Sequence, residues 1–339
     1  MTALAVVGLG MVSPLGLTPA EHAFFARAGT GPAAPGAFID DQGETMNVAH
    51  CPWLGAGLPV AARLTALGAR ALAAALAGRP QDASTVLFAC TAAPRAGLAE
   101  PDREACEAAL CRVAKVRTAA RATGAAGFFH ALGTAAAQLE QGAARFAAVV
   151  AVDSLVSPAL LADWQRTATT PWESNLPRPA EGAAALLLAL PSEARRSGLD
   201  VLATLQKSTC AHGEANDDND AIIDGAALTG LLRGAPRGVA AVFGQHRLGS
   251  LRKREWAIAS ARTAEMFRQD LVLVSIEHEI GCLGAAAGGM NLAHGIAVHR
   301  HQAWPIEDDA PEPREEGPFL AWAISPDGVR GLCVASARG

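Results

Sequence analysis

The sequence of 339 residues predicts an α/β protein in which strands and helices alternate and pack in layers. Short apolar runs of strand length occur at 4–8, 86–90, 147–152, 184–190, 239–243, 271–276 and 331–335. Alanine-rich stretches with the period of a helix lie between several of them, at 61–78, 124–142 and 284–299. Hydrophobic residues make up 50% of the chain, so a large core can form, and the length allows two fused halves of one large domain.

The first predicted strand, 4–8, runs into a turn that contains Gly8, Gly10, Ser13, Pro14 and Gly16. Glycine supplies backbone angles that other residues rarely adopt, so the chain can turn tightly here. A dinucleotide-binding G-x-G-x-x-G motif would need glycine at position 13 and a helix beginning where Pro14 and Gly16 stand. The turn therefore argues against a nucleotide-binding fold of that type.

The opening stretch 6–16 closely resembles the start of β-ketoacyl synthases, the condensing enzymes of fatty-acid and polyketide assembly. Two later stretches, 178–188 and 281–288, resemble that family's Gly-Glu-Gly-Ala-Gly turn and its Gly-His-Leu-x-Gly-Ala-Ala-Gly helix start. The resemblance implies a thiolase-like fold with two pseudo-repeated βαβαβ-type halves in an α/β/α/β/α core. We expect the halves at 1–192 and 193–339.

The same resemblance implies that the catalytic residues of the family are missing. Its acyl-carrying cysteine begins a buried helix, and the matching segment 118–125 places Arg121 or Ala120 there; neither side chain can form a thioester. The first histidine aligns with Val242, or with His246 in a shifted register. The second aligns with Cys282, or with Gly281 after a slip of one residue, and the supporting lysine with Glu277. The sequence thus predicts a degenerate, non-catalytic member without cofactor or metal.

Arg121 carries two alternative interpretations. A cation at a buried helix start is costly unless it is paired, because desolvation and the positive helix end both oppose it. In the first interpretation, Arg121 pairs with a carboxylate such as Asp153 or Glu181, or extends to solvent. In the second, it forms an anion site in what remains of the family's active-site pocket.

Other chemistry has little support. A Cys-His pair could combine Cys90 or Cys111 with His130 or His246, but lone cysteines in apolar stretches are most often buried hydrophobes. The spacings between His294, His299 and His301 do not align three side chains on one helix face, which argues against a metal site. The acidic segment 214–224 and the proline-rich stretch 305–318 read as solvated loops.

The charge and the cysteine content of the chain limit its possible binding partners and its cellular compartment. A net charge of −5 and a pI near 6.0 argue against nucleic acid, and no bulk charge signal points to a membrane. The longest apolar run, 183–190, is too short to span a bilayer, and no secretory signal is recognised. Seven cysteines without a C-x-x-C pair favour a reducing cytoplasm.

A framework without its chemistry predicts a protein that acts by binding another protein. Segments 38–44 and 48–54 resemble degenerate thiolase-like proteins encoded beside type VI secretion spike and effector genes, which favours an adaptor role in effector loading. The first alternative is a chain-length-factor-like subunit that partners an active synthase. The second is an acyltransferase with a non-family active site. By resemblance we expect a homodimer or heterodimer whose shared edge is the run 147–152.

Overall fold

The computed structural model describes residues 3–29, 31, 47–55, 57–78, 85–117, 119–167, 178–213, 223–247, 249–304 and 317–337. The segment 38–44, the acidic residues 214–222 and most of 305–318 lie outside these ranges. In the described part of the chain, no helix is both long and apolar enough to cross a membrane.

The first half of the chain holds five strands and six helices within the described residues. They are β1 (Leu4–Val12), α1 (Pro19–Arg27), α2 (Val60–Leu76), β2 (Thr85–Thr91), α3 (Glu100–Ala114), β3 (Ala119–Thr123), α4 (Gly127–Glu140), β4 (Phe146–Ser154), α5 (Pro158–Thr167), β5 (Glu181–Ala189) and α6 (Pro191–Arg196).

The second half follows with β6 (Ala203–His212), α7 (Ala226–Arg233), β7 (Val239–Phe243), α8 (Gly249–Ala261), the 3₁₀ turn η1 (Ala264–Met266) and β8 (Phe267–Val274). The chain continues through α9 (Ile276–Ile280), η2 (Gly284–Ala286), α10 (Ala287–His301), β9 (Phe319–Ile324) and β10 (Val329–Ala337).

The strands form one mixed sheet in the order β3-β2-β4-β5-β1-β6-β10-β9-β7-β8. Counted from β3 toward the middle of the sheet, the neighbouring strands of the first half are its third, second, fourth, fifth and first strands in sequence. Read inward from β8, the second half has the same order, with β6 as its first strand. The halves meet where β1 pairs with β6 over Leu4–Val6 and Ala203–Leu205. The topology therefore repeats about the middle of the sheet.

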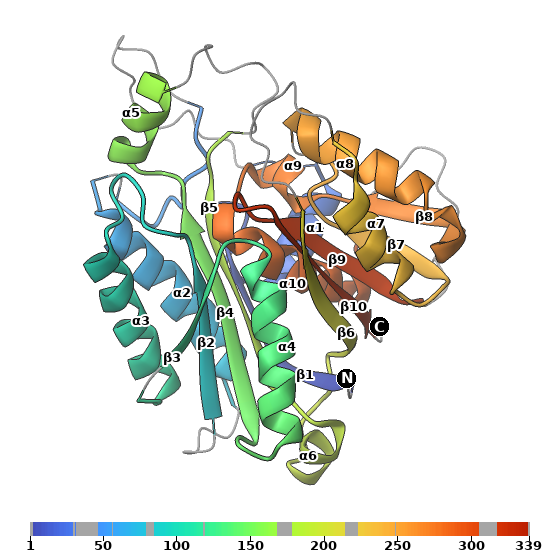
Figure 1. The fold of residues 1–339 in the computed structure, drawn as a ribbon. Coiled ribbons are helices and arrows are strands. Elements are labelled where there is room, and N and C mark those ends of the chain that lie inside the picture. The colour runs from blue at the N-terminus through green and yellow to red at the C-terminus, as the bar shows by residue number, and fades with distance from the viewer. Residues whose placement is uncertain are drawn as a thin grey trace.

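Helices cover the sheet in three layers (Figure 1). Helices α2 and α3 pack outside the first half, α7 and α8 outside the second, and α4 and α10 lie between the two halves. Each layer has its own buried cluster: Leu67 and Leu72 belong to the α2 side, Leu228 and Trp256 to the α7 and α8 side, and Phe128 and Met290 to the middle. The predicted five-layer α/β/α/β/α arrangement is confirmed.

All seven predicted strands exist, and the three predicted helical stretches are α2, α4 and α10. Strands β3, β6 and β9 were missed. Strand β3 is only five residues long and carries Arg121, and β6 contains the polar run Gln206 to Thr209, so neither shows a clear apolar pattern.

The predicted position of the dimer edge is wrong. The run 147–152 lies in β4, which is buried along its length between β2 and β5. The edges of the sheet are β3 and β8. Strand β3 pairs in parallel with β2 on one side only, and Ala120, Arg121 and Thr123 are exposed on it.

Candidate functional site

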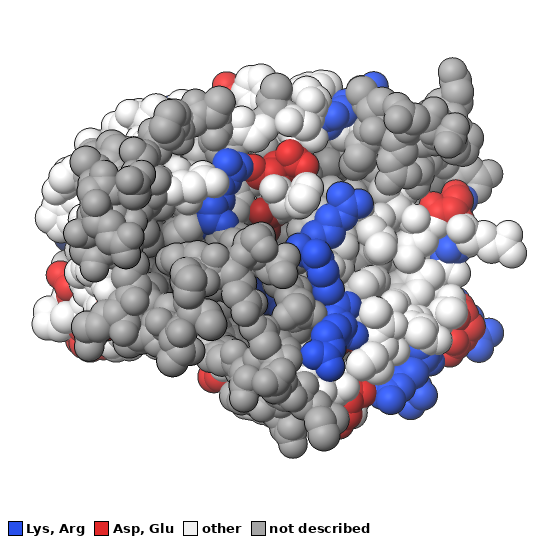
Figure 2. Space-filling view, turned by 90° about the horizontal axis from the view of Figure 1, so that it is seen from above, with Lys and Arg blue, Asp and Glu red and all other residues white. Residues whose placement is uncertain are grey.

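His246, Glu277 and Cys282 follow β7 and β8, and the start of α4 follows β3, so these positions lie beyond the carboxyl ends of strands. Strands β2, β3 and β4 are parallel to one another, and β7 is parallel to β8, so the carboxyl ends lie together within each group. Such a carboxyl edge is the usual place for a site in α/β proteins. Figure 2 shows this face from above, with a row of Lys and Arg side chains across it and acidic side chains beside the row.

Helix α4 begins at this edge without a nucleophile. Gly124 turns the chain from β3 into α4 with a φ of 76°, and Ala125 and Ala126 follow, both buried. The Gly124 amide donates to the Thr91 carbonyl at 3.0 Å, and the Ala126 amide donates to Ser325 Oγ at 2.8 Å. A Cβ on Gly288 would overlap the Ala125 carbonyl, so α10 packs directly against this turn. The start of α4 is thus closed by backbone atoms, apolar side chains and the Ser325 hydroxyl.

The prediction that Ala120 or Arg121 stands at the start of a buried helix is wrong. Both lie in β3, before the turn, and not at the start of α4. The Arg121 side chain is 37% exposed and pairs with Glu107, at 2.7 Å from Nε, and with Glu100. Asp153 and Glu181 pair with other arginines. Arg121 is therefore a surface residue of β3 that pairs with α3, and the described residues form no buried anion site around it.

Asp153, at the end of β4, forms a nearly buried ion pair with Arg95. Arg95 Nη2 donates to Asp153 Oδ1 at 2.5 Å and Nη1 donates to Oδ2 at 3.1 Å. The Ala285 amide of η2 also donates to Oδ2, at 2.8 Å, and the Ser154 amide donates to Oδ1 at 2.7 Å. The carboxylate thus links the loop after β2 to the turn before α10.

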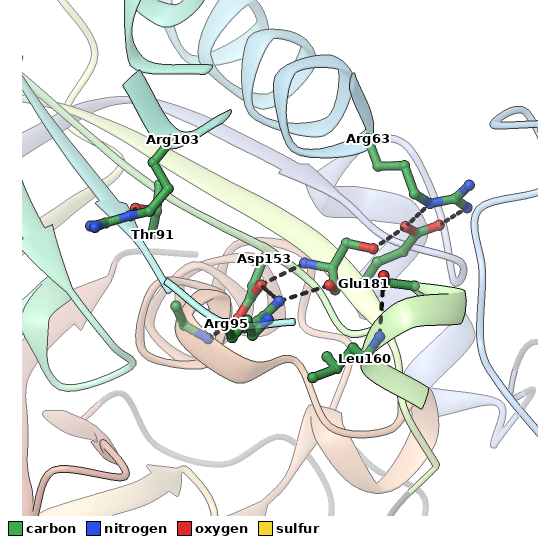
Figure 3. Close-up of polar contacts among 10 residues, drawn as sticks. Arg63, Thr91, Arg95, Arg103, Asp153, Leu160 and Glu181 are labelled. Carbon is green, nitrogen blue, oxygen red and sulfur yellow. Dashed lines mark hydrogen bonds and ion pairs between the residues drawn. The ribbon is translucent and has the colours of Figure 1, made fainter. Parts of the chain in front are cut away.

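Glu181 forms a second ion pair beside the first, fully buried (Figure 3). Arg63 of α2 donates to its two oxygens, each at 2.8 Å, and the Ser154 hydroxyl donates to Oε2 at 2.8 Å. The Cys51 amide donates to Oε1 at 2.7 Å. Ser154 therefore joins the two ion pairs, with its amide on Asp153 and its hydroxyl on Glu181.

The second half contributes an amide–carboxyl pair instead of an ion pair. Gln245 Nε2 donates to Glu277 Oε2 at 2.9 Å, and the Leu283 amide donates to Oε1 at 3.0 Å. Burial raises the pKa of the Glu277 carboxyl above its usual range, although the charge of Arg252 and both hydrogen bonds oppose this. Glu277, aligned with the lysine, is thus a buried acid.

His246 follows Gln245 and is buried against Trp256, with ring centroids 5.9 Å apart. Neither ring nitrogen has a hydrogen-bond partner among the described residues. Burial, helped by the charge of Arg247, lowers the pKa of the imidazole to about 3. Val242 lies inside β7 with its side chain in the cluster beside α7 and α8, so it does not reach the sheet edge.

Cys282 lies between α9 and η2 and is partly exposed. Its amide donates to the Arg178 carbonyl at 2.8 Å. Burial of the thiol, and then the charge of Glu277, raise its pKa to about 11, so it is protonated at neutral pH. A protonated thiol is a poor nucleophile.

The alternative pairings do not assemble among the described residues. Cys90 is buried in β2 and Cys111 in α3, while His130 is exposed on α4, and no hydrogen bond joins either cysteine to His130 or His246. His294 and His299 are buried in α10. In the ranges that the structure covers, no group of three or more His, Cys, Asp or Glu side chains is arranged to hold a metal ion.

Comparisons with known proteins identify the fold. No protein-family model and no curated protein matches the sequence. Among solved structures, the ishigamide ketosynthase/chain length factor matches with a TM-score of 0.73 at 20% identity, over 99% of this chain and 100% of that one.

Two further structures agree. The ketosynthase from module 6 of the bacillaene synthase of Bacillus subtilis 168 matches with a TM-score of 0.78 at 14% identity, over 99% of this chain and 72% of that one. The AntDE:AntF complex, a type II polyketide synthase acyl-carrier protein with its ketosynthase, matches with a TM-score of 0.77 at 15% identity, over 99% of each chain.

Proposed function

Because the chain has the fold of ketosynthases, we propose that it is a non-condensing protein of this fold that acts by binding another protein. The observation that carries the proposal is the start of α4, where Gly124, Ala125 and Ala126 stand and none of these three side chains can carry an acyl group. The proposal needs no cofactor and no metal.

The other aligned positions support the same proposal. Condensation needs a thiolate to carry the acyl chain and donors or imidazoles to stabilise negative charge. Cys282 is protonated at neutral pH because its pKa is about 11, and His246 is a neutral, buried ring. Glu277 would bring a carboxyl group where the family has a cation.

We propose that the partner pairs along the free edge of β3. A short edge strand with one unpaired side can add a strand from another chain. A twofold contact of two β3 strands would give a homodimer, and a β3 strand from a related chain would give a heterodimer.

Two classes of partner fit the proposal. A chain-length-factor-like role beside an active synthase is supported by the likeness to the ishigamide ketosynthase/chain length factor. An adaptor role in type VI secretion is supported by the sequence of segments 38–44 and 48–54. Both place the protein in the cytoplasm, where its seven free cysteines would stay reduced.

Intact mass spectrometry tests the lack of acyl transfer. The purified protein is incubated with acyl-CoA and with acylated carrier protein, and we expect no covalent adduct and no condensation with malonyl carrier protein. An adduct that disappears in Cys282→Ser or Cys111→Ser would instead indicate an acyltransferase with a different active site.

Light scattering tests whether the protein dimerises through the free edge of β3. We expect a dimer at micromolar concentration, and Ala120→Lys should weaken it at least about tenfold because a charge on an edge strand blocks pairing. Glu104→Lys, an exposed change on α3, is the matched control. A monomer that also fails to pair with any partner through β3 would contradict the proposed edge.

A further inference from the structure

We propose that the loop directly before α2 is a second interaction surface, built to dock a protein whose interface has an apolar pocket edged by carboxylates. The surface, called here the Trp53 loop, comprises residues 51–55 and 57–59. The inference rests on the proposed function, because it assumes that the protein works by binding, but it concerns a site away from β3.

The Trp53 loop exposes large apolar side chains. Trp53 is 40% exposed and Leu58 is 38% exposed, and Pro52 and Pro59 beside them are exposed as well. Few large hydrophobic side chains among the described residues are this exposed, and two of them lie within this short loop. Leaving such side chains in water is unfavourable, and a cluster of them commonly marks an interface.

Buried groups anchor the Trp53 loop to the core of the protein. Cys51 and Leu54 are buried, and the Leu54 amide donates to the Cys51 carbonyl at 3.0 Å. The buried ion pair of Arg63 and Glu181 reaches both ends of this turn: Glu181 accepts from the Cys51 amide at 2.7 Å, and Arg63 Nη1 donates to the Gly55 carbonyl at 2.7 Å.

This anchoring matters for binding. A loop that is already fixed loses little conformational freedom when a partner covers it, so more of the contact energy appears as affinity. Figure 3 shows Arg63 and Glu181 pointing at one another from α2 and β5, so the support comes from the rigid part of the fold. The loop therefore presents its apolar side chains in a fixed arrangement.

Charge indicates the chemistry of the partner. Residues 47–78 contain no Asp or Glu, although the whole chain has a net charge of −5. Arg70 of α2 is exposed, and its guanidinium carbon lies 5.5 Å from the centre of the Trp53 ring. Tryptophan and arginine are the side chains most enriched at binding hot spots. A carboxylate on the partner would pair with Arg70 while an apolar pocket covers Trp53 and Leu58.

Site-specific photo-crosslinking in the native host tests the surface first. A photoreactive side chain is placed at position 53, at position 58, and at Val201 as a control, which is 40% exposed but lies in the loop before β6. We expect the same protein to be captured from positions 53 and 58 and not from 201. The absence of an adduct, the same adducts from all three positions, or capture of a second copy of this chain would overturn the inference.

Binding of the captured protein, once purified, then decides the inference. Trp53→Ala and Leu58→Ala should each weaken its binding at least about tenfold, and Arg70→Glu should weaken it more than Arg70→Gln. Val201→Ala is the matched control and should bind as the wild type does. Thermal unfolding of each variant must match the wild type, as expected for side chains that lie over the surface.

The two proposals fail in different ways. If the captured protein binds all of these variants equally but loses binding with Ala120→Lys, the Trp53 loop is wrong and the binding function stands. If the pure chain forms acyl adducts or condenses substrates, the proposed function is wrong whatever the loop does.

Discussion

The two halves of the molecule share one strand order but close their carboxyl edges differently. In the first half, all four oxygens of Asp153 and Glu181 accept hydrogen bonds, and each carboxylate faces an arginine. In the second half, Glu277 is paired with the neutral amide of Gln245. Within the part of the chain that the structure describes, both nitrogens of His246 and the hydroxyl of Ser275 lack partners.

The difference shows how polar groups can be buried in two ways. Removing one member of a buried ion pair is costly, because the other charge is left buried without a partner. A neutral imidazole without partners is stable only while it remains neutral, since a charged ring would be buried without compensation. At these sites, the ion pairs of the first half should therefore respond most to loss of a member, and His246 of the second half should respond most to acid.

The largest effect is expected from Glu181→Ala. It leaves Arg63 buried without its carboxylate, so the free energy of unfolding should fall by about 3–5 kcal/mol in chemical denaturation. Replacing both residues by Arg63→Leu and Glu181→Leu should restore part of the loss. Asp270→Ala, which removes a surface pair with Arg268, is the control and should change stability little. Equal losses in both single variants would remove the distinction between buried and surface pairs.

Acid should lower the stability of the fold through its buried histidines, and the variant His246→Phe tests the contribution of one of them. Burial lowers the pKa of His246 to about 3, so between about pH 6.5 and pH 3 only the unfolded chain binds this proton. Stability is therefore lost as the pH falls through that window, by about 1.4 kcal/mol per pH unit for this group.

The phenylalanine variant should lose about 1–3 kcal/mol less than the wild type between pH 6 and pH 4 in denaturant titrations. Burial also lowers the pKa values of His22, to about 4, and of His294, to about 3, so the variant keeps some acid sensitivity. His130→Phe, at an exposed position, is the comparison variant. An unchanged pH profile in His246→Phe would show that this ring is not buried as a neutral group.

The smallest effect is expected from Arg121→Ala. Its guanidinium is 37% exposed, so loss of its pair with Glu107 should cost less than about 1 kcal/mol by thermal or chemical unfolding. Phosphate should not raise the thermal stability of the wild type through this residue. A loss of several kcal/mol would restore the interpretation of Arg121 as a buried cation.

Much of the fold could be predicted because long apolar strands such as β4 and β5 are buried on both faces and show it in their composition. The position of α4 could not be placed as well. Motif alignment put Arg121 at the helix start, but Gly124 turns the chain three residues later and leaves Arg121 in an edge strand. A glycine directly before two alanines was the local signal for this turn.

The ion-pair network was missed because its members are far apart in sequence. Arg95 and Asp153 are separated by 58 positions and Arg63 and Glu181 by 118, and no periodicity in the sequence links such pairs. From the sequence, Glu181 stood in a resembling turn and was a possible partner of Arg121, while Arg63 was only one residue of the helical stretch 61–78. Their pairing depends on α2 packing across β5, which is a property of the assembled layers.

The repeated strand order also bears on how far an assembly of this chain could grow. The sheet has two ends, β3 and β8, and a contact from β3 of one molecule to β8 of the next would continue without limit as a filament. Strand β8 carries Arg268, Gln269 and Asp270 at its edge, and charged side chains of this kind discourage strand addition. Strand β3 carries a single charged residue, Arg121, which is held in ion pairs with Glu100 and Glu107, so its edge has less protection. Pairing confined to β3 would use up the one receptive end of each molecule, so growth would stop at two chains.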